Sequence, residues 1–359
     1  MNDQAMPLPS LRILKLRATL RWSRPDAIPG PAIANVLRGA LGITFRKLVC
    51  PIEWFDHECH PCSLYRSCAY GQLFMPKPTD ESGVLKKQQD APRPFVIEPP
   101  GLHSEMDLNQ DELTFHIVLF GTAVDESTLF LSTLIRLCHE GIGRNRTSLD
   151  MVQVLAEHPQ GNEIVLVGTE SQIHPPTRYF TTSDFSIDSN KTLLQEIPLL
   201  TIHFTSPLLL KAGSGVLPNG ARVEAREVRE SPPFGVLISR LRDRLSSLSA
   251  FFGERWQADF RAIGERANSV SIHKSKTVWL TRNRRSTRTG HAHEISGLVG
   301  HATYRFESAE EVEFFLPLLR IGELIHVGKN APWGNGGIRI GSLRSTNRTE
   351  NAKMEGGVK

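Results

Sequence analysis

The chain of 359 residues lacks several features that would place it in a common class. No apolar run approaches the ~20 residues that cross a bilayer. The opening MNDQAMPLPS has an early acid and two prolines in place of the apolar core of a secretory signal. A strong excess of one sign of charge is also absent: 42 Lys and Arg residues oppose 38 Asp and Glu residues, for a net charge of +4. We therefore expect a cytoplasmic protein with no membrane partner.

The glycine spacings of nucleotide-binding folds are also missing. A P-loop needs G-x-x-x-x-G-K-[ST], and a dinucleotide fold needs G-x-G-x-x-G at a helix start. The densest glycine cluster here, GELIHVGKNAPWGNGGIRI at 322–340, instead follows an apolar segment and enters β-type sequence. ATP and NAD are therefore poor ligands. Two interpretations remain open: a tight turn, or a backbone whose outward N–H groups bind a polymeric phosphate.

Basic residues support the second interpretation. Lys329 and Arg339 flank the glycines at 328, 334, 336 and 337, and the segment RNRRSTR at 282–288 holds four arginines in seven residues. Runs of like charge are usually solvated surface. Four arginines within β-type sequence, in a chain that also has the glycine cluster, favour phosphate binding.

Four of the five cysteines fall within a short segment as C-x8-C-x2-C-x5-C: Cys50, Cys59, Cys62 and Cys68. Structural disulfides are rare in a reducing compartment, so this set indicates a metal site. Zinc is preferred, an iron–sulfur cluster and free thiols remain open, and His57 or His60 could replace one ligand. Such a site would be structural, because four thiolates leave no position for a substrate. Cys138 lies on an apolar helix face and belongs in the core.

Periodicity predicts an α+β fold of two consecutive β-α-β-β-α-β-like units, that is, tandem ferredoxin-like (RAMP/RRM-like) domains with a Cys-rich metal-binding insertion. We expect strands over 10–23, 112–121, 141–156, 198–211, 274–280, 294–306 and 338–343, and helices over 31–50, 125–140, 232–256 and 308–328. The predicted domains are 1–190, with the insertion at about 50–100, and 191–343, joined near 185–197. The tail at 344–359 is predicted to be disordered.

The glycine cluster and its surroundings resemble a known signature. ISGLVGHATY and FFLPLLRIGELIHVGKNAPWGNGGIRI resemble the C-terminal signature of the CRISPR-associated endoribonucleases that cut precursor CRISPR RNA, the repeat-processing family (CRISPR-associated protein six) of the RAMP superfamily. Arg284, Ser286 and Arg288 match that family's Arg-x-Ser-x-Arg-Gln segment, and Thr289 stands where glutamine is usual. The cysteines with the closing CAYGQLF, and GIGRNR at 141–146, resemble further family patterns.

The resemblance implies a protein that binds CRISPR repeat RNA and cleaves it once, without metal in the chemistry, to give mature guide RNA. The ribose 2′-OH would attack the adjacent phosphate and leave a 2′,3′-cyclic phosphate and a 5′-OH. The residues predicted to contact RNA are Arg46, Lys47, Arg144, Arg146, Arg282, Arg284, Arg285, Ser286, Arg288, Gly328, Gly334, Gly336, Gly337 and Arg339.

The catalytic residues are harder to assign, because many relatives carry a histidine near the first helix and residues 31–49 contain none. We predict His326 as the acid–base group, beside Lys329 and Arg38 for charge stabilisation, although a histidine near a helix C-terminus also fits a structural role. The reserves are His291, His293, His301 and Tyr304. One alternative is a non-cleaving RAMP subunit that holds CRISPR RNA among the other subunits of an effector complex. A zinc-dependent hydrolase is disfavoured, since no His/Asp set beyond the thiolates has ligand spacing.

Overall fold

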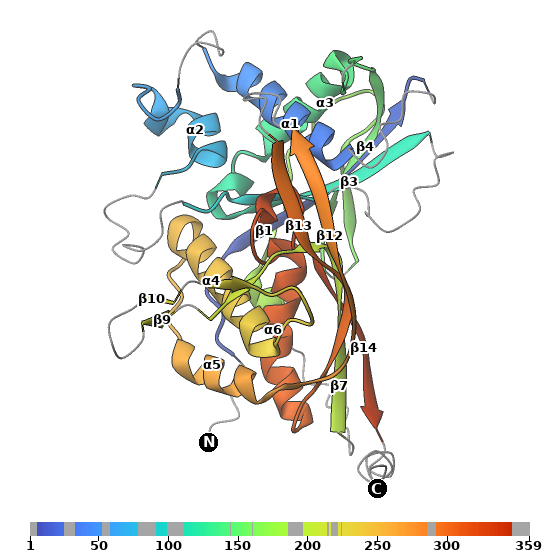
Figure 1. The fold of residues 1–359 in the computed structure, drawn as a ribbon. Coiled ribbons are helices and arrows are strands. Elements are labelled where there is room, and N and C mark those ends of the chain that lie inside the picture. The colour runs from blue at the N-terminus through green and yellow to red at the C-terminus, as the bar shows by residue number, and fades with distance from the viewer. Residues whose placement is uncertain are drawn as a thin grey trace, which may run out of the picture.

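The computed structural model describes residues 6–24, 33–51, 58–77, 91–98, 111–143, 145–159, 161–185, 197–213, 215–216, 222–223, 225–285 and 292–346. They form two antiparallel sheets, each with helices packed on one face (Figure 1).

The first sheet and its helices have the ferredoxin-like order. The strands β1 (Arg12–Trp22), β2 (Phe95–Glu98), β3 (Glu112–Phe120), β4 (Leu149–Glu157) and β5 (Glu163–Val167) lie in the order β2-β3-β1-β4-β5, and β6 (Phe180–Thr181) pairs with β1. Helices α1 (Ile33–Val49) and α3 (Ser127–Glu140) supply the two crossovers, and the short α2 (Ala69–Phe74) follows the cysteine segment.

The second domain repeats this order. The strands β7 (Ile197–Leu208), β12 (Ser271–Arg285), β13 (Ala292–Arg305) and β14 (Ile338–Thr346) lie in the order β12-β13-β7-β14. Its helices are α4 (Phe234–Phe252), α5 (Phe260–Ser269) and α6 (Ala309–Ile325). Two-residue strands form the small pairs β8 (Lys211–Ala212) with β11 (Arg226–Glu227) and β9 (Gly215–Val216) with β10 (Arg222–Val223).

The predicted tandem ferredoxin-like fold is therefore confirmed, with differences in detail. The elements not predicted are β2, β5, β6, the two-residue strands β9 to β11, α2 and α5. The expected tail begins too early, because Arg344 to Thr346 belong to β14. Helix α6 begins with a serine cap, since the Ser308 hydroxyl accepts a hydrogen bond from the Glu311 N–H at 3.4 Å. Most of the predicted junction at 185–197 and the tail beyond Thr346 lie outside the described residues.

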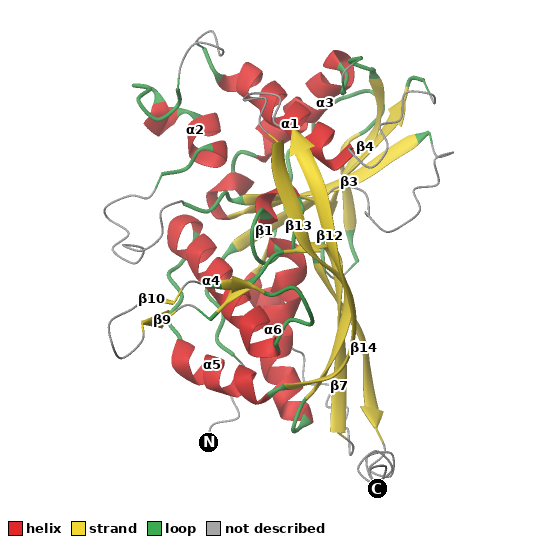
Figure 2. Ribbon diagram, in the orientation of Figure 1, coloured by secondary structure: helices red, strands yellow, loops and turns green. Residues whose placement is uncertain are grey.

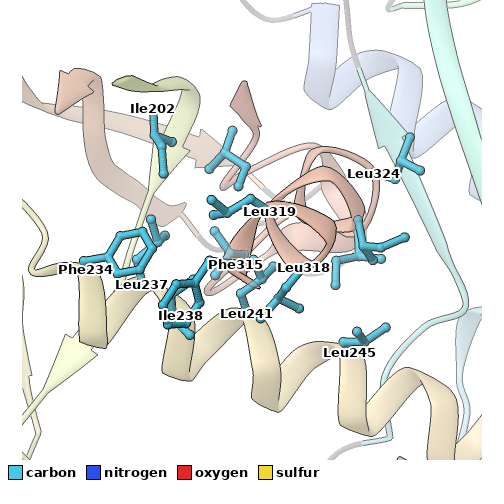
Figure 3. Close-up of a cluster of buried hydrophobic side chains, with 14 of the residues drawn as sticks. Ile202, Phe234, Leu237, Ile238, Leu241, Leu245, Phe315, Leu318, Leu319 and Leu324 are labelled. Atoms are coloured by element: carbon cyan, nitrogen blue, oxygen red, sulfur yellow. The ribbon is translucent and has the colours of Figure 1, made fainter. Parts of the chain in front are cut away.

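Alternation along β1 explains how the two domains share a core. Leu14, Leu16 and Ala18 face α1 and α3, whereas Ile13, on the opposite face, joins the core of the second domain. That second core is built where α4 and α6 pack together, with Leu241 and Leu318 fully buried between them (Figure 3). The first sheet thus uses part of its second face as a domain interface, and the rest of that face carries polar side chains.

Helices α4, α5 and α6 lie together on one side of the second sheet, and no described helix covers its other side (Figure 2). Among the described residues, no helix is both long and apolar enough to span a membrane.

Candidate functional site

The glycine loop, residues 328–337, connects α6 to β14. A short 3-10 turn, Ala331–Trp333, occupies its middle, and Gly328, Gly334 and Gly336 adopt φ values of 86°, 80° and 69°. These left-handed conformations favour glycine and let the loop turn back on itself. The loop lies against the end of β7, where Gly337 N–H donates to the Ser206 hydroxyl at 2.7 Å.

Close packing is the reason for the glycines. A Cβ on Gly336 would lie 1.7 Å from the carbonyl oxygen of Val327, and one on Gly328 would lie 2.5 Å from that of Leu209. The N–H groups of Gly334, Gly336 and Gly337 all donate hydrogen bonds inside the protein. The expectation that these N–H groups face outward to a phosphate is therefore wrong, and the tight-turn interpretation accounts for the loop.

His326 lies at the C-cap of α6 and is buried, with 5% of its surface exposed. Its Nε2 lies 2.9 Å from Glu98 Oε1, and its Nδ1 lies 3.0 Å from the carbonyl oxygen of Asn335. Both partners are acceptors, so a ring protonated on both nitrogens satisfies both bonds. The backbone of His326 has φ 58° and ψ 171°, a conformation that costs a non-glycine residue about 1–3 kcal/mol. In this arrangement, His326 ties β2 to the glycine loop and has no nitrogen left for a substrate.

Glu98 is the acidic centre of a polar network between the two sheets. Burial raises the pKa of Glu98, but the hydrogen bond and positive charge of His326, helped by Lys15 and Arg339, hold that pKa at about 2. Next to it, His116 lies 3.7 Å from Glu98 and 3.5 Å from Glu157. Carboxylates thus balance the cations on this face of the first sheet, which makes it a poor surface for a polyanion.

Arg38 of α1 stacks on the glycine loop. Its guanidinium carbon lies 3.6 Å from the ring centroid of Trp333, and that of Arg93 lies 5.2 Å from it. Phe95 meets the same indole edge-on at 5.8 Å. The structure therefore brings the predicted residue Arg38 to the loop, as a packing partner of Trp333.

Two other basic residues of α1 have partners within the protein. Arg46 is buried, with 9% of its surface exposed, and faces the ring of Tyr70. Lys47 forms an ion pair with Glu140 at 2.9 Å. The contact of these two residues with RNA stays a prediction.

The second sheet carries a different kind of surface on its open side. The pairing register aligns four basic side chains across all four strands, one from each strand, in a set called here the basic row: Lys276, His301, His203 and Arg339. The rings of His203 and His301 have centroids 5.5 Å apart. His203 is exposed and leans over β14, where a Cβ on Gly341 would lie 2.9 Å from its Nε2.

No Asp or Glu is paired across the strands with a residue of the basic row. The next row holds Lys274, Thr303 and Thr201, and within the described residues neither Lys274 nor Lys276 forms an ion pair with a carboxylate. His301 was predicted as a reserve for the catalytic site, and His203 was not predicted from the sequence. Its position could have been predicted from the alternation in TIHFTS: Ile202 and Phe204 are buried, so His203 between them points to the other face of the sheet.

The remaining predicted residues have mixed outcomes. Lys329 is exposed at the start of the glycine loop, and Arg146 is exposed in a turn with φ 47°. Tyr304 is fully buried and donates to the Pro232 carbonyl at 2.8 Å, so it is not available to a substrate. Arg282, Arg284 and Arg285 lie on β12, and His293 lies on β13 opposite Arg284. Arg144, Ser286, Arg288 and His291 lie outside the described residues.

The four clustered cysteines line one cavity, together with Tyr65 and Tyr70. Burial raises the pKa of Cys59, the positive charge of Arg46 opposes that rise, and the other three thiols reinforce it. His60 is exposed and does not line this cavity, and His57 lies outside the described residues.

Comparison with known proteins relates the second domain to a known family. Residues 202–338, which include Lys276, His301 and His203 of the basic row and the whole glycine loop, match the model of the CRISPR-associated endoribonuclease Cas6. The second domain is therefore similar to the CRISPR-associated Cas6 endoribonucleases. In the first domain, residues 11–178 match a family model described as an N-terminal domain, AF_1859_N.

Similar proteins cover more than nine-tenths of this chain. An uncharacterised protein of Archaeoglobus fulgidus is 25% identical over 334 residues, which cover 93% of this chain and 99% of that protein. A Cas6 product complex (TTHB231) has a TM-score of 0.51 at 15% identity, covering 92% of this chain and 99% of the other. A partial Cas6-RT-Cas1–Cas2 complex has a TM-score of 0.53 at 12% identity, covering 95% of this chain and 48% of the other. The two structural matches show a shared fold.

Proposed function

We propose that this chain binds CRISPR repeat RNA on the open side of its second sheet and cleaves it to process precursor CRISPR RNA. The observation that carries the proposal is the basic row, which crosses an uncovered sheet face. Three of its four residues, Lys276, His301 and His203, lie within the region that matches the Cas6 model. Arg339 lies 3.9 Å from the Glu98 carboxylate, whereas Lys276 forms no ion pair with a carboxylate in the described part of the chain and attracts phosphates. Histidine rings provide stacking surfaces for unpaired bases.

Cleavage needs a base for the 2′-OH, an acid for the departing 5′-oxygen and positive charge near the phosphorane. Imidazole both accepts and donates protons near neutral pH. His203 and His301, with ring centroids 5.5 Å apart, therefore supply this pair, each contributing roughly 10²–10⁴-fold. Lys276 and Arg339 sit at the two ends of the row, where they stabilise negative charge.

His326 has a different part in this scheme. Because both of its ring nitrogens are engaged, it positions the glycine loop against β2, and its predicted acid–base role passes to the row. Lys329 is exposed at the start of the glycine loop, and its positive charge attracts the phosphates of the RNA backbone. Arg38 supports the loop through Trp333.

The test is to incubate the purified full chain with end-labelled repeat RNA in EDTA and to analyse the products. We expect a single cut that leaves a 2′,3′-cyclic phosphate and a 5′-OH, since no step requires a metal ion. Tight binding without any cut would overturn cleavage and favour the alternative, a non-cleaving subunit that holds CRISPR RNA in an effector complex. Cleavage that requires added divalent metal would overturn the proposed chemistry.

A further inference from the structure

The cysteine segment, residues 58–68, buries little surface, although the Tyr65 hydroxyl donates to the Met75 carbonyl at 2.9 Å and Lys77 donates to the His60 carbonyl at 2.7 Å. Across 58–68 no residue is buried, and the only regular structure is the 3-10 turn Tyr65–Ser67, which buries nothing. A segment that buries so little surface cannot offset the conformational entropy lost on ordering. Yet its cysteines are only partly exposed and face a common cavity.

The placement of the four thiols explains what orders the segment. Cys50 directly follows α1 and donates its N–H to the Arg46 carbonyl at 2.8 Å, so it is fixed to the end of that helix. Cys68 directly precedes α2. Cys59 and Cys62 occupy one turn, closed by a Cys62 N–H to Cys59 carbonyl bond of 3.2 Å. Two anchored thiols and a C-x2-C turn thus surround one cavity.

From this geometry we propose that Cys50, Cys59, Cys62 and Cys68 bind one structural zinc ion that joins the end of α1 to the start of α2. Four thiolates are a closed tetrahedral donor set for zinc. Among the described residues, no three possible ligands are gathered closely enough to hold an ion, so the thiols that line the cavity would move together when zinc binds. Arg46, buried beside the segment, partly balances the negative charge of a zinc tetrathiolate.

The zinc ion would also support the glycine loop. Tyr70, which lines the cavity, stacks on Phe74 at 5.0 Å, and Phe74 contacts Phe95 at 4.8 Å. Phe95 in turn meets Trp333 of the loop at 5.8 Å. A continuous series of aromatic contacts therefore connects the metal site to the loop, from the first domain to the second.

The test begins with wild-type protein, freed of any affinity tag and purified from zinc-supplemented culture. We expect about one tightly bound zinc per chain by elemental analysis, and a lower unfolding temperature after chelation. Cobalt exchanged into the site should show thiolate-to-cobalt charge-transfer absorption. Cys62→Ser should lose the metal, whereas Cys138→Ala, which removes the buried thiol outside the segment, should keep it.

The wild-type measurements stand even if Cys62→Ser does not fold. Protein that carries no metal and has four thiols reacting freely with a thiol reagent in the native state would overturn the site. Iron with acid-labile sulfide, found after anaerobic purification, would overturn the assignment to zinc.

Discussion

The imidazole of His326 and the carboxylate of Glu98 meet at 2.9 Å across the domain interface, although they are 228 positions apart in the chain. Both side chains are at least nine-tenths buried, and the backbone at His326 is held in a conformation that other residues rarely adopt. The pair connects β2 of the first domain to the glycine loop of the second. It therefore adds a buried polar contact between the domains to the hydrogen bonds that hold the loop against β7.

Removing the Glu98 carboxylate should be strongly destabilising. Glu98→Ala leaves a buried histidine without its acceptor, and breaking such a pair costs about 3–5 kcal/mol. Urea unfolding measures the change. The control is Glu163→Ala, which removes a half-exposed partner of Arg17 on the same sheet and should cost less than about 1 kcal/mol. Equal losses of unfolding free energy in the two variants would show that the Glu98–His326 pair contributes no more than an exposed ion pair.

Stability should fall in acid through Glu98. Its folded-state pKa of about 2 lies below the ordinary value of 4.5, so its contribution is fully present above pH 4.5 and is lost as pH falls toward 2. Urea unfolding at a series of pH values checks this. Glu98→Gln should flatten that part of the profile relative to wild type. An unchanged slope in Glu98→Gln would assign the acid sensitivity to other carboxylates.

Gly336→Ala should damage the fold, because the new Cβ would meet the Val327 carbonyl at 1.7 Å and φ is 69°. We expect a loss of more than about 3 kcal/mol, since both the backbone strain and the clash must be relieved. Gly264→Ala is the matched control: it lies inside α5 with nothing within 4 Å, and should stabilise by about 0.5–1 kcal/mol. Thermal unfolding of both variants tests the comparison.

Substituting the paired histidines should separate cleavage from binding. His203→Ala and His301→Ala should each slow single-turnover cleavage by roughly 10²-fold, while repeat affinity changes by less than about 1 kcal/mol. His174→Ala, an exposed histidine of the first domain, is the control and should cleave normally. Normal cleavage by both row variants, with loss in His326→Ala, would return the acid–base role to His326.

Lys276 should contribute to binding through charge. Lys276→Ala should weaken repeat affinity at low salt and reduce the slope of log K against log salt by about 0.7–0.9, the value for one lost phosphate contact. Lys211→Ala removes an exposed lysine of β8, outside the four-stranded sheet, and should leave the slope unchanged. Identical slopes in wild type and Lys276→Ala would show that the row does not contact the backbone.

Local sequence patterns were sufficient for most of the fold. The alternation of apolar residues predicted β1, and the 3.6-residue period predicted α1 and α3, because burial of one face requires these patterns. Strand β2 escaped detection, since three apolar residues and one glutamate between long connectors carry no readable period. Glu98 was missed with it, and so was the partner that engages His326.

The sequence by itself determined which residues are basic, which face of each strand they occupy, and that glycines dominate one loop. Only the tertiary structure decided which strands lie side by side, and so placed Lys276, His301, His203 and Arg339 in one row. It also decided that the N–H groups of the loop bond inward. The physical reason is that periodicity records only whether a side chain is buried. Strand register, by contrast, results from packing between segments that are distant in the chain.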